Sequence, residues 1–409
     1  MPELAELRAR YDALVARDLH LDLTRGKPAP DQLSLSDELL RLPGDVYRDA
    51  AGTDLRNYGG AAGLPELREI FAPALRVPVE RLLALGNSSL QLMHDVVTFA
   101  LLHGVPGGDG PWRDLEQVSV LCPVPGYDRH FSVCEALGVR MIPVPMTEEG
   151  PDTAIAAALV AADPSIRGMF CVPVHSNPTG TTYSERVVRE LVSMPAAPDF
   201  RIIWDNAYAV HHLSDDVPEP VDVLGLAAEA GNPDRPLVFA STSKVTYPGS
   251  GVAFFGASEA NVAWLTKRRS VQTIGPDKLN QLRHVQLLRD SDGLAAHMAK
   301  HRELLAPKFA AVEEILSDRF ADSGLESWTT PTGGYFVSLM VKKGCAARAI
   351  ELAKQAGIAV TPAGSTYPYH DDPDDANIRI APTFPTIEDL RAALDGLCTS
   401  VLLAEHEER

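Results

Sequence analysis

Three polar side chains follow apolar runs of the sequence, and together their types suit one kind of chemistry. Lys244 follows LVFASTS, Asp205 follows RIIW, and Asn177 follows VPVHS. An ammonium group at the end of a buried strand is costly unless it is paired, neutralised or consumed in a covalent bond. Lys244 is therefore either a solvated surface residue or a functional residue that the preceding strand positions.

The runs before these residues are expected to be strands of one sheet. Near-continuous apolar runs are typical of strands that are covered on both faces, and helical segments between several of them predict a mostly parallel sheet. Ligands bind outside the carboxyl ends of such strands, so the three side chains can meet in one crevice. The candidate strands are 117–124, 139–145, 166–174, 200–205, 236–241 and 251–257.

The chain of 409 residues is too long for one small core and predicts two packed units in an α/β protein. We expect residues 1–44 to form an N-terminal arm and part of a small domain. Residues 45–285 should form a large cofactor-binding domain. Residues 286–409 should supply an interdomain helix and the rest of the small α+β domain.

The composition excludes several classes of partner. The chain has 37 basic and 55 acidic residues, a net charge of −18 that argues against nucleic acid and anionic membranes. No run of 18 apolar residues occurs, so no membrane span is expected and a cytoplasmic location is predicted. The five scattered cysteines form no CxxC pair, and His175, His211 and His212 lack metal-ligand spacing, so we predict no metal site.

Pyridoxal phosphate is a cofactor that would use an amine, a phosphate cup and a carboxylate together. It forms a Schiff base with a lysine and withdraws electrons while its ring nitrogen is protonated, which a buried carboxylate maintains. Asp205, after the apolar residues IIW, suits that role, and Asn177 and Tyr208 could donate hydrogen bonds to the ring oxygen. Considered singly, each residue has another interpretation: Asp205 as a turn residue and Lys244 as a solvated surface charge.

The chain resembles the fold-type I pyridoxal-phosphate-dependent aminotransferases of class I/II. This resemblance implies a large domain with a mostly parallel seven-stranded sheet covered by helices, and a smaller α+β domain built from both chain ends. The motifs that carry it lie in order along most of the chain: LTRGKP (23–28), NYGGAAGLPELREIFA (57–72), ALGNSSLQL (84–92), PVPGYDRH (123–130), SNPTG (176–180), DNAY (205–208), STSK (241–244), PTGGYF (331–336) and NIRIAPT (377–383).

The resemblance assigns roles around the cofactor ring. Lys244 would form the imine and later carry the proton between the substrate's Cα and the cofactor, which requires a neutral amine. Asp205 would pair with the ring nitrogen, and Tyr208 and Asn177 with the ring oxygen. Tyr127 would stack on the ring, although a packed core aromatic is the alternative.

The phosphate would lie at the start of a helix, where unpaired N–H groups and the helix dipole favour an anion. Ser88, Ser89 and Ser241 would add hydroxyl donors. Tyr58 would reach the phosphate of a neighbouring subunit, which implies a homodimer with shared active sites. A tyrosine buried at a helix entrance is the alternative.

For the substrate, Arg379 matches the family's arginine that binds the α-carboxylate. Its planar guanidinium suits bidentate hydrogen bonds to a carboxylate. Gly26 would let the N-terminal loop close over the substrate, and Asn177 would also contact it. A dicarboxylic substrate needs a second cation. Arg129 is the first candidate, with a surface charge as an equal alternative, and Arg25 and Lys27 follow.

One departure from the family pattern lies after Lys244. The family usually has a phosphate-binding arginine eight residues after the lysine, whereas here Gly251 or Val252 stands there. Lys278, further hydroxyls or the helix dipole could replace it, and the sequence does not choose among them. The same loop, with LTRGKP and QTIGPDKLNQLRH, resembles a bacterial subgroup of aspartate aminotransferases.

The expected reaction is therefore ping-pong transamination between aspartate and 2-oxoglutarate. Transamination of aromatic amino acids or alanine, and C–S bond cleavage on the same fold, are the alternatives. A regulatory ligand-binding module is a different class of protein. Such regulators carry a winged helix ahead of this fold, whereas the predicted core here begins near residue 45.

Overall fold

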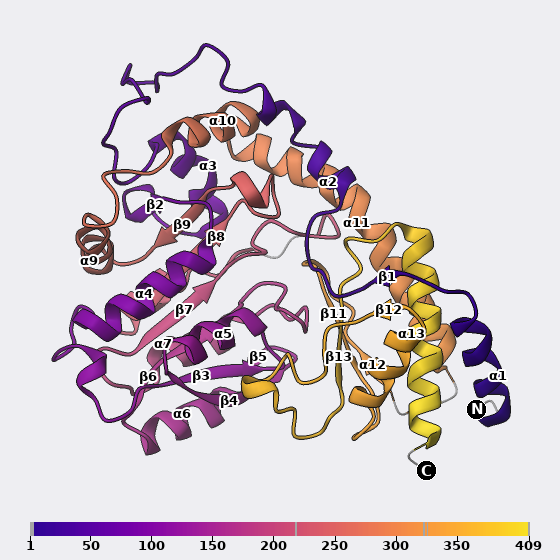
Figure 1. The fold of residues 1–409 in the computed structure, drawn as a ribbon. Helices are drawn as coiled ribbons and strands as arrows, with labels where there is room; N and C mark the ends of the chain where they lie inside the picture. Colours follow the sequence, from indigo (N-terminus) through magenta and orange to yellow (C-terminus); the bar gives the residue numbers. More distant parts are fainter. Residues whose placement is uncertain (1–3, 217–218, 322–323, 325, 408–409) are drawn as a thin grey trace.

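The computed structural model describes residues 4–216, 219–321, 324 and 326–407. A large sheet with helices packed against it occupies the left part of the molecule in Figure 1. In spatial order its strands are β2 (Leu82–Ala84), β9 (Ala253–Gly256), β8 (Pro236–Ser241), β7 (Arg201–Asp205), β6 (Ile166–Cys171), β3 (Ser119–Val124), β4 (Arg140–Thr147) and β5 (Gly150–Pro151).

The predicted mostly parallel sheet is confirmed. Strands β8, β7, β6, β3 and β4 run parallel, and β9 runs antiparallel to both of its neighbours. Seven strands match the expected number, and the two-residue β5 adds a short antiparallel extension to β4. The three-residue β2 was absent from the candidate strands, because so short an apolar run does not stand out beside the helices that flank it.

Helices cover both faces of this sheet, which explains the continuous apolar runs. Along β7, Ile202 and Trp204 belong to one hydrophobic cluster, and Ile203 between them belongs to another. The first cluster includes side chains of α3 (Pro65–Leu75), α6 (Thr153–Ala162), α7 (Glu185–Ser193), α8 (Val223–Glu229) and α10 (Lys278–Leu288). The second includes side chains of α4 (Ser89–His103), α5 (Asp128–Ala136) and α9 (Glu259–Arg269).

A second hydrophobic core is built from both ends of the chain. The first strand pairs in parallel with β12, and α1 lies beside α13, with both termini on one side of the molecule (Figure 1). Its elements are α1 (Leu4–Val15), β1 (Leu21–Asp22), β10 (Ser327–Trp328), β11 (Val337–Met340), α12 (Ala346–Gln355), β12 (Ile358–Ala359), β13 (Asn377–Ile380) and α13 (Ile387–Glu407).

The long helix α11 (Ser291–Phe320) joins the two cores. Leu294 and Met298 near its start pack in the large core, and Phe309 and Leu316 pack in the second. A short helix, α2 (Pro30–Ser34), lies against α11. The exact domain boundaries stay a prediction: the boundary at 285 falls inside α10, and residues 1–3 and 408–409 are outside the described residues.

None of the helices in the described part of the chain combines the length and the apolar composition that a membrane crossing requires.

Candidate active site

Most of the predicted site residues meet at one edge of the large sheet. Asp205 is the last residue of β7, and Lys244 follows β8. Tyr127 follows β3 and Asn177 follows β6, two neighbouring strands between which the strand order reverses. Ser88 follows β2, which runs in the same direction as β8 because both are antiparallel to β9. Ligands bind at such a switch point in open α/β sheets.

These residues enclose a cavity of about 200 Å³. Eight of the residues predicted from the sequence line it: Ser88, Ser89, Tyr127, Asn177, Asp205, Tyr208, Ser241 and Lys244. Four others do not line it, namely Gly26, Tyr58, Arg129 and Arg379.

Lys244 lies among aromatic rings in this cavity. Its Nζ atom is 4.9 Å from the ring centre of Tyr208 and 5.8 Å from that of Tyr335. Burial lowers the pKa of the Lys244 amine below its ordinary value, while the Asp205 carboxylate opposes the shift. Burial also raises the pKa of the Tyr127 and Tyr208 hydroxyls, so both remain protonated donors. The cavity thus favours an amine that can lose its proton.

Asp205 has one paired and one unpaired carboxylate oxygen. Its Oδ2 is 2.9 Å from Nε2 of His130, and both side chains are buried. Its Oδ1 is also buried and has no hydrogen-bond partner among the described residues. A buried acceptor without a donor is costly, so this oxygen fits the protonated ring nitrogen of pyridoxal phosphate. The sequence did not single out His130, although it lies three residues after Tyr127 in PGYDRH.

One end of the cavity carries hydroxyl groups. Ser88 caps the N-terminus of α4, where its Oγ accepts from the N–H of Gln91 at 3.3 Å. Ser241 donates to Oγ of Ser243 at 3.0 Å. These hydroxyls and the first N–H groups of α4 can hold a phosphate. Among the described residues that line the cavity, Lys244 is the one cationic side chain.

Lys278, one of the three possible replacements for the missing arginine, is engaged elsewhere. Its ammonium group donates to the backbone carbonyls of Asn57 at 2.9 Å and Gly59 at 2.8 Å. Val252, one of the two residues that could occupy the family's arginine position, is buried, and its N–H donates to Oγ1 of Thr242. The hydroxyls and the helix N-terminus are therefore the groups that this chain offers to a phosphate at this end.

Helix α10 holds the loops that build the cavity, a function that the sequence did not reveal. Asn280 donates to the carbonyls of Ser250 and Gly251, both at 3.0 Å, in the loop after Lys244. His284 bonds Oγ1 of Thr246 in the same loop at 2.9 Å. Gln281 connects two further segments, through the carbonyl of Ala84 at 2.9 Å and the N–H of Leu64 at 2.7 Å.

Arg379 comes from the other sheet, at the third residue of β13, and is buried beside the cavity. Its Nη1 donates to Oδ1 of Asp128 at 2.8 Å and to Oδ1 of Asn177 at 3.4 Å. Its Nε donates to Oγ1 of Thr361 at 3.4 Å. The guanidinium carbon lies 4.9 Å from the ring centre of Phe336.

The remaining predicted residues lie outside this cavity. A Cβ added to Gly26 would be 2.1 Å from Cζ of Phe336, so the N-terminal loop runs directly against that ring. Tyr58 is 82% exposed, and Arg129 is also exposed, at the start of α5. Arg25 pairs with Asp22. Lys27 lies over the ring of Phe384.

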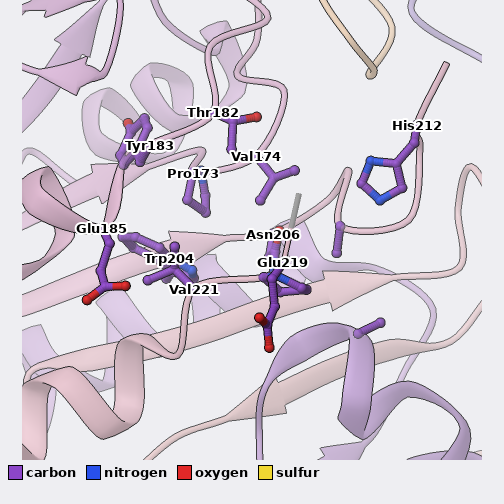
Figure 2. Close-up of a pocket in the computed structure, with 13 residues that line it drawn as sticks. Pro173, Val174, Thr182, Tyr183, Glu185, Trp204, Asn206, His212, Glu219 and Val221 are labelled. Atoms are coloured by element: carbon purple, nitrogen blue, oxygen red, sulfur yellow. The ribbon is translucent and has the colours of Figure 1, made fainter. Parts of the chain in front are cut away.

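A second cavity, of about 250 Å³, lies beside this site, and Figure 2 shows its lining. Trp204 and Asn206 flank Asp205 in the sequence and line this cavity, together with His212. None of the residues predicted to hold the cofactor or the substrate is in its lining. Among the described residues, no group of three His, Cys, Asp or Glu side chains is placed to hold a metal ion.

The chain is similar along its length to known proteins. The model of the aspartate amino-transferase family matches residues 2–409. A protein of Mycolicibacterium smegmatis named as an aminotransferase is 60% identical over 407 residues, 98% of this chain and 95% of that protein. The crystal structure of an aspartate transaminase from Corynebacterium glutamicum has a TM-score of 0.97 and 50% identity, covering 99% of this chain and 96% of that chain.

A more distant solved structure shares the fold. It is an alpha-aminoadipate aminotransferase from Thermus thermophilus, complexed with N-(5'-phosphopyridoxyl)-L-leucine. The TM-score is 0.76 at 22% identity, with 98% of each chain covered.

Proposed function

The chain belongs to the aspartate amino-transferase family and is a fold-type I aminotransferase, and from that premise we propose that it transfers amino groups between aspartate and 2-oxoglutarate with pyridoxal phosphate as cofactor. The observation that carries the proposal is one cavity in which a buried amine, Lys244, lies with a buried carboxylate oxygen of Asp205 that has no partner among the described residues. The name of the 50% identical Corynebacterium glutamicum protein supports aspartate as the substrate.

When bound, the cofactor supplies an electron-withdrawing ring that stabilises negative charge on the substrate's Cα. The residues of the chain transfer the proton and hold the cofactor. Lys244, with its lowered pKa, accepts the proton from Cα and returns it. The unpaired oxygen of Asp205 would accept a hydrogen bond from the protonated ring nitrogen, and His130 holds the other oxygen of that carboxylate. Tyr208 and Asn177 would donate to the ring oxygen, and Tyr127 would stack on the ring.

We also assign the phosphate to Ser88 and Ser89 at the start of α4 and to Ser241 at the end of β8. The substrate's α-carboxylate is assigned to Arg379 beside Asn177. Gly26 lets the N-terminal loop lie against the substrate site. Arg129 is the proposed partner of the second carboxylate. Its exposed position requires its side chain to fold back over the cavity when a dicarboxylate binds.

The proposed enzyme is a homodimer, and exposed apolar side chains support this. Tyr58 is 82% exposed, Val271 is 88% exposed and Ile274 is 64% exposed. The segments that carry them are adjacent: a Cβ on Gly275 would lie 2.4 Å from the carbonyl oxygen of Gly59. Exposed apolar residues that gather on one surface mark interaction sites. In the dimer, Tyr58 would enter the partner's cavity and add a hydroxyl at the phosphate.

Lys244→Ala tests the cofactor claim. Protein purified with added pyridoxal phosphate should absorb visible light, and after borohydride reduction mass spectrometry should find the cofactor on the peptide that contains Lys244. The variant should lose this attachment and its transaminase activity, whereas Lys267→Ala, on the exposed side of α9, should keep both. Wild-type protein that takes up no cofactor would contradict the proposal.

A panel of amino donors tests the substrate. With 2-oxoglutarate as acceptor, kcat/KM should be highest for L-aspartate and much lower for L-tyrosine, L-alanine and L-cystathionine. A higher value for tyrosine or alanine, or pyruvate release from cystathionine, would replace aspartate transamination with one of the other activities. It would leave the cofactor assignment intact.

A further inference from the structure

Arg379 already holds a carboxylate of its own chain. Its Nη1 lies 2.8 Å from Oδ1 of Asp128, the first residue of α5. The Arg379 side chain is 8% exposed and that of Asp128 is 28% exposed, so the pair lies at the border between protein and solvent. The proposed function gives this same guanidinium to the α-carboxylate of the substrate, and two carboxylates therefore compete for it.

The other contacts of the Arg379 guanidinium limit which of its nitrogens a substrate carboxylate can use. A carboxylate that binds in the bidentate way uses two neighbouring nitrogens, either Nη1 with Nη2 or Nε with Nη2. Nη1 already donates to Asp128 and Asn177, and Nε already donates to Thr361. The Nη1–Nη2 mode therefore replaces an acceptor of Nη1, whereas the Nε–Nη2 mode replaces Thr361. The exchange proposed below uses the Nη1–Nη2 mode. Of these acceptors, Asp128 is the charged one.

Burial explains why a resident carboxylate is needed. Arg379 lies in a strand that is buried throughout and against the ring of Phe336. A buried guanidinium without a counter-ion is strongly unfavourable, and Asp128 supplies one while no substrate is bound. When a second carboxylate arrives, repulsion between the two anions favours release of Asp128. Its partly exposed side chain can then be hydrated.

We propose that Asp128 is a resident counter-ion that the substrate's α-carboxylate displaces from Arg379, and that this exchange sets the affinity of the enzyme for its substrates. The inference rests on the proposed function, because it takes Arg379 as the substrate-binding arginine. Asp128 is an affinity-determining residue in this scheme and takes no part in proton transfer.

The charge of Asp128 also lies in the first turn of α5, where an acidic residue stabilises a helix. This alternative role makes a different prediction. Removing a residue that only stabilises the helix lowers stability. Removing an ordinary binding-site residue weakens carboxylate binding, whereas removing a displaced counter-ion has the opposite effect. Its removal should tighten binding.

Asp128→Asn in the cofactor-loaded enzyme tests the inference, because asparagine keeps the shape and loses the charge. The inhibition constant of succinate, and KM for aspartate and for 2-oxoglutarate, should each fall about tenfold, the factor expected for one charge-assisted hydrogen bond. kcat should change less than KM. Glu135→Gln removes the same charge from an exposed position on the same helix and should leave these constants unchanged.

Two further variants distinguish failure of the counter-ion inference from failure of the proposed function of Arg379. Arg379→Gln should weaken succinate binding. If it does not, Arg379 is not the substrate's arginine, and the proposed function of this residue fails together with the inference. If Arg379→Gln weakens binding while Asp128→Asn leaves it unchanged or weaker, the counter-ion inference alone is wrong. Asp128→Ser keeps a hydroxyl at the helix start and repeats the test if the asparagine variant unfolds.

Discussion

One aromatic ring links Gly26 to Arg379. The ring of Phe336 lies against the guanidinium of Arg379, and it also fills the space that a side chain at position 26 would need. If Arg379 binds the substrate as proposed, the N-terminal loop would affect substrate binding through this ring and without a charged contact of its own.

Gly26→Ala should therefore raise KM for the amino acid about tenfold, since the new methyl group displaces Phe336 from Arg379 and small misplacements at such sites are costly. Steady-state kinetics with aspartate measures this effect. Gly110→Ala is the matched control, because a Cβ there meets nothing within 4 Å. An unchanged KM in Gly26→Ala would show that Phe336 does not hold Arg379 in place.

Two buried histidines share the carbonyl next to Lys244. Nε2 of His297 lies 2.8 Å and Nε2 of His301 lies 3.0 Å from the oxygen of Val245. Nδ1 of His301 is 3.2 Å from Nε2 of Gln32. A ring that donates through Nε2 and accepts through Nδ1 is neutral. Burial and the neighbouring His297 lower the pKa of His301 to about 4.

This shift predicts the pH dependence of stability. In the unfolded chain a histidine takes up its proton near pH 6.5, whereas folded His301 stays neutral down to about pH 4. The unfolded state thus binds more protons between these values, and the free energy of unfolding should fall as the pH drops from 6.5 to 4. Urea denaturation at several pH values measures the slope. His301→Gln should make the slope shallower, and an equal slope in both proteins would contradict the assignment.

At the residue scale, the sequence predicted the residues at or shortly after the ends of strands and missed their partners. Lys244, Asp205, Asn177 and Tyr127 all line one cavity because parallel strands end at one edge. Asp128 was missed, since its partner Arg379 lies 251 residues away in the sequence. Similarly, His130 and Asp205 are 75 residues apart. Such pairs depend on how two distant elements pack, which apolar periodicity does not encode.

Among the elements, α10 connects the loops that surround the cavity. Its polar side chains bond backbone groups of the loop after Lys244, of the segment before Ser88, and of the loop that carries Tyr58. The motif QTIGPDKLNQLRH was recognised only by resemblance. The bonds go to backbone atoms, whose positions a sequence pattern does not reveal.

Asn280→Ala tests this function of α10. It removes the donor to the carbonyls of Ser250 and Gly251, and should lower the free energy of unfolding by about 2 kcal/mol. It should also raise the dissociation constant of the cofactor several-fold, because the loop after Lys244 loosens. Absorbance titration of the cofactor-free enzyme measures the second effect.

The matched control for Asn280 is Asn261 in α9, a buried asparagine that donates to the carbonyl of Asp234. Asn261→Ala should lower stability to a similar extent and leave cofactor affinity unchanged. If both substitutions raise the dissociation constant of the cofactor equally, the effect of Asn280→Ala comes from general destabilisation. Asn280 then has no specific function in supporting the site.

The whole molecule should work as a pair of subunits. Replacing Ile274 with aspartate puts a charge on the exposed apolar surface beside Tyr58, and burying that charge in an interface is unfavourable. Ile274→Asp should therefore sediment as a monomer and lose most of its activity, because the proposed contact of Tyr58 with the partner's cavity would be lost. Analytical ultracentrifugation measures the first effect.

Ile155→Asp is the control, because Ile155 is a partly exposed apolar residue on α6. It should keep the assembly state of the wild-type protein. A wild-type chain that sediments as a monomer with full activity would exclude the shared active site.

The hydroxyl-lined end of the cavity has a consequence for how the proposed cofactor would be retained. Ions in solution screen a guanidinium–phosphate attraction, but they weaken short hydrogen bonds to serine hydroxyls and backbone N–H groups much less. The described residues at this end offer mainly the second kind of contact. Cofactor retention should therefore change little with ionic strength, and a concentrated-salt wash that strips arginine-anchored phosphates should leave this protein coloured.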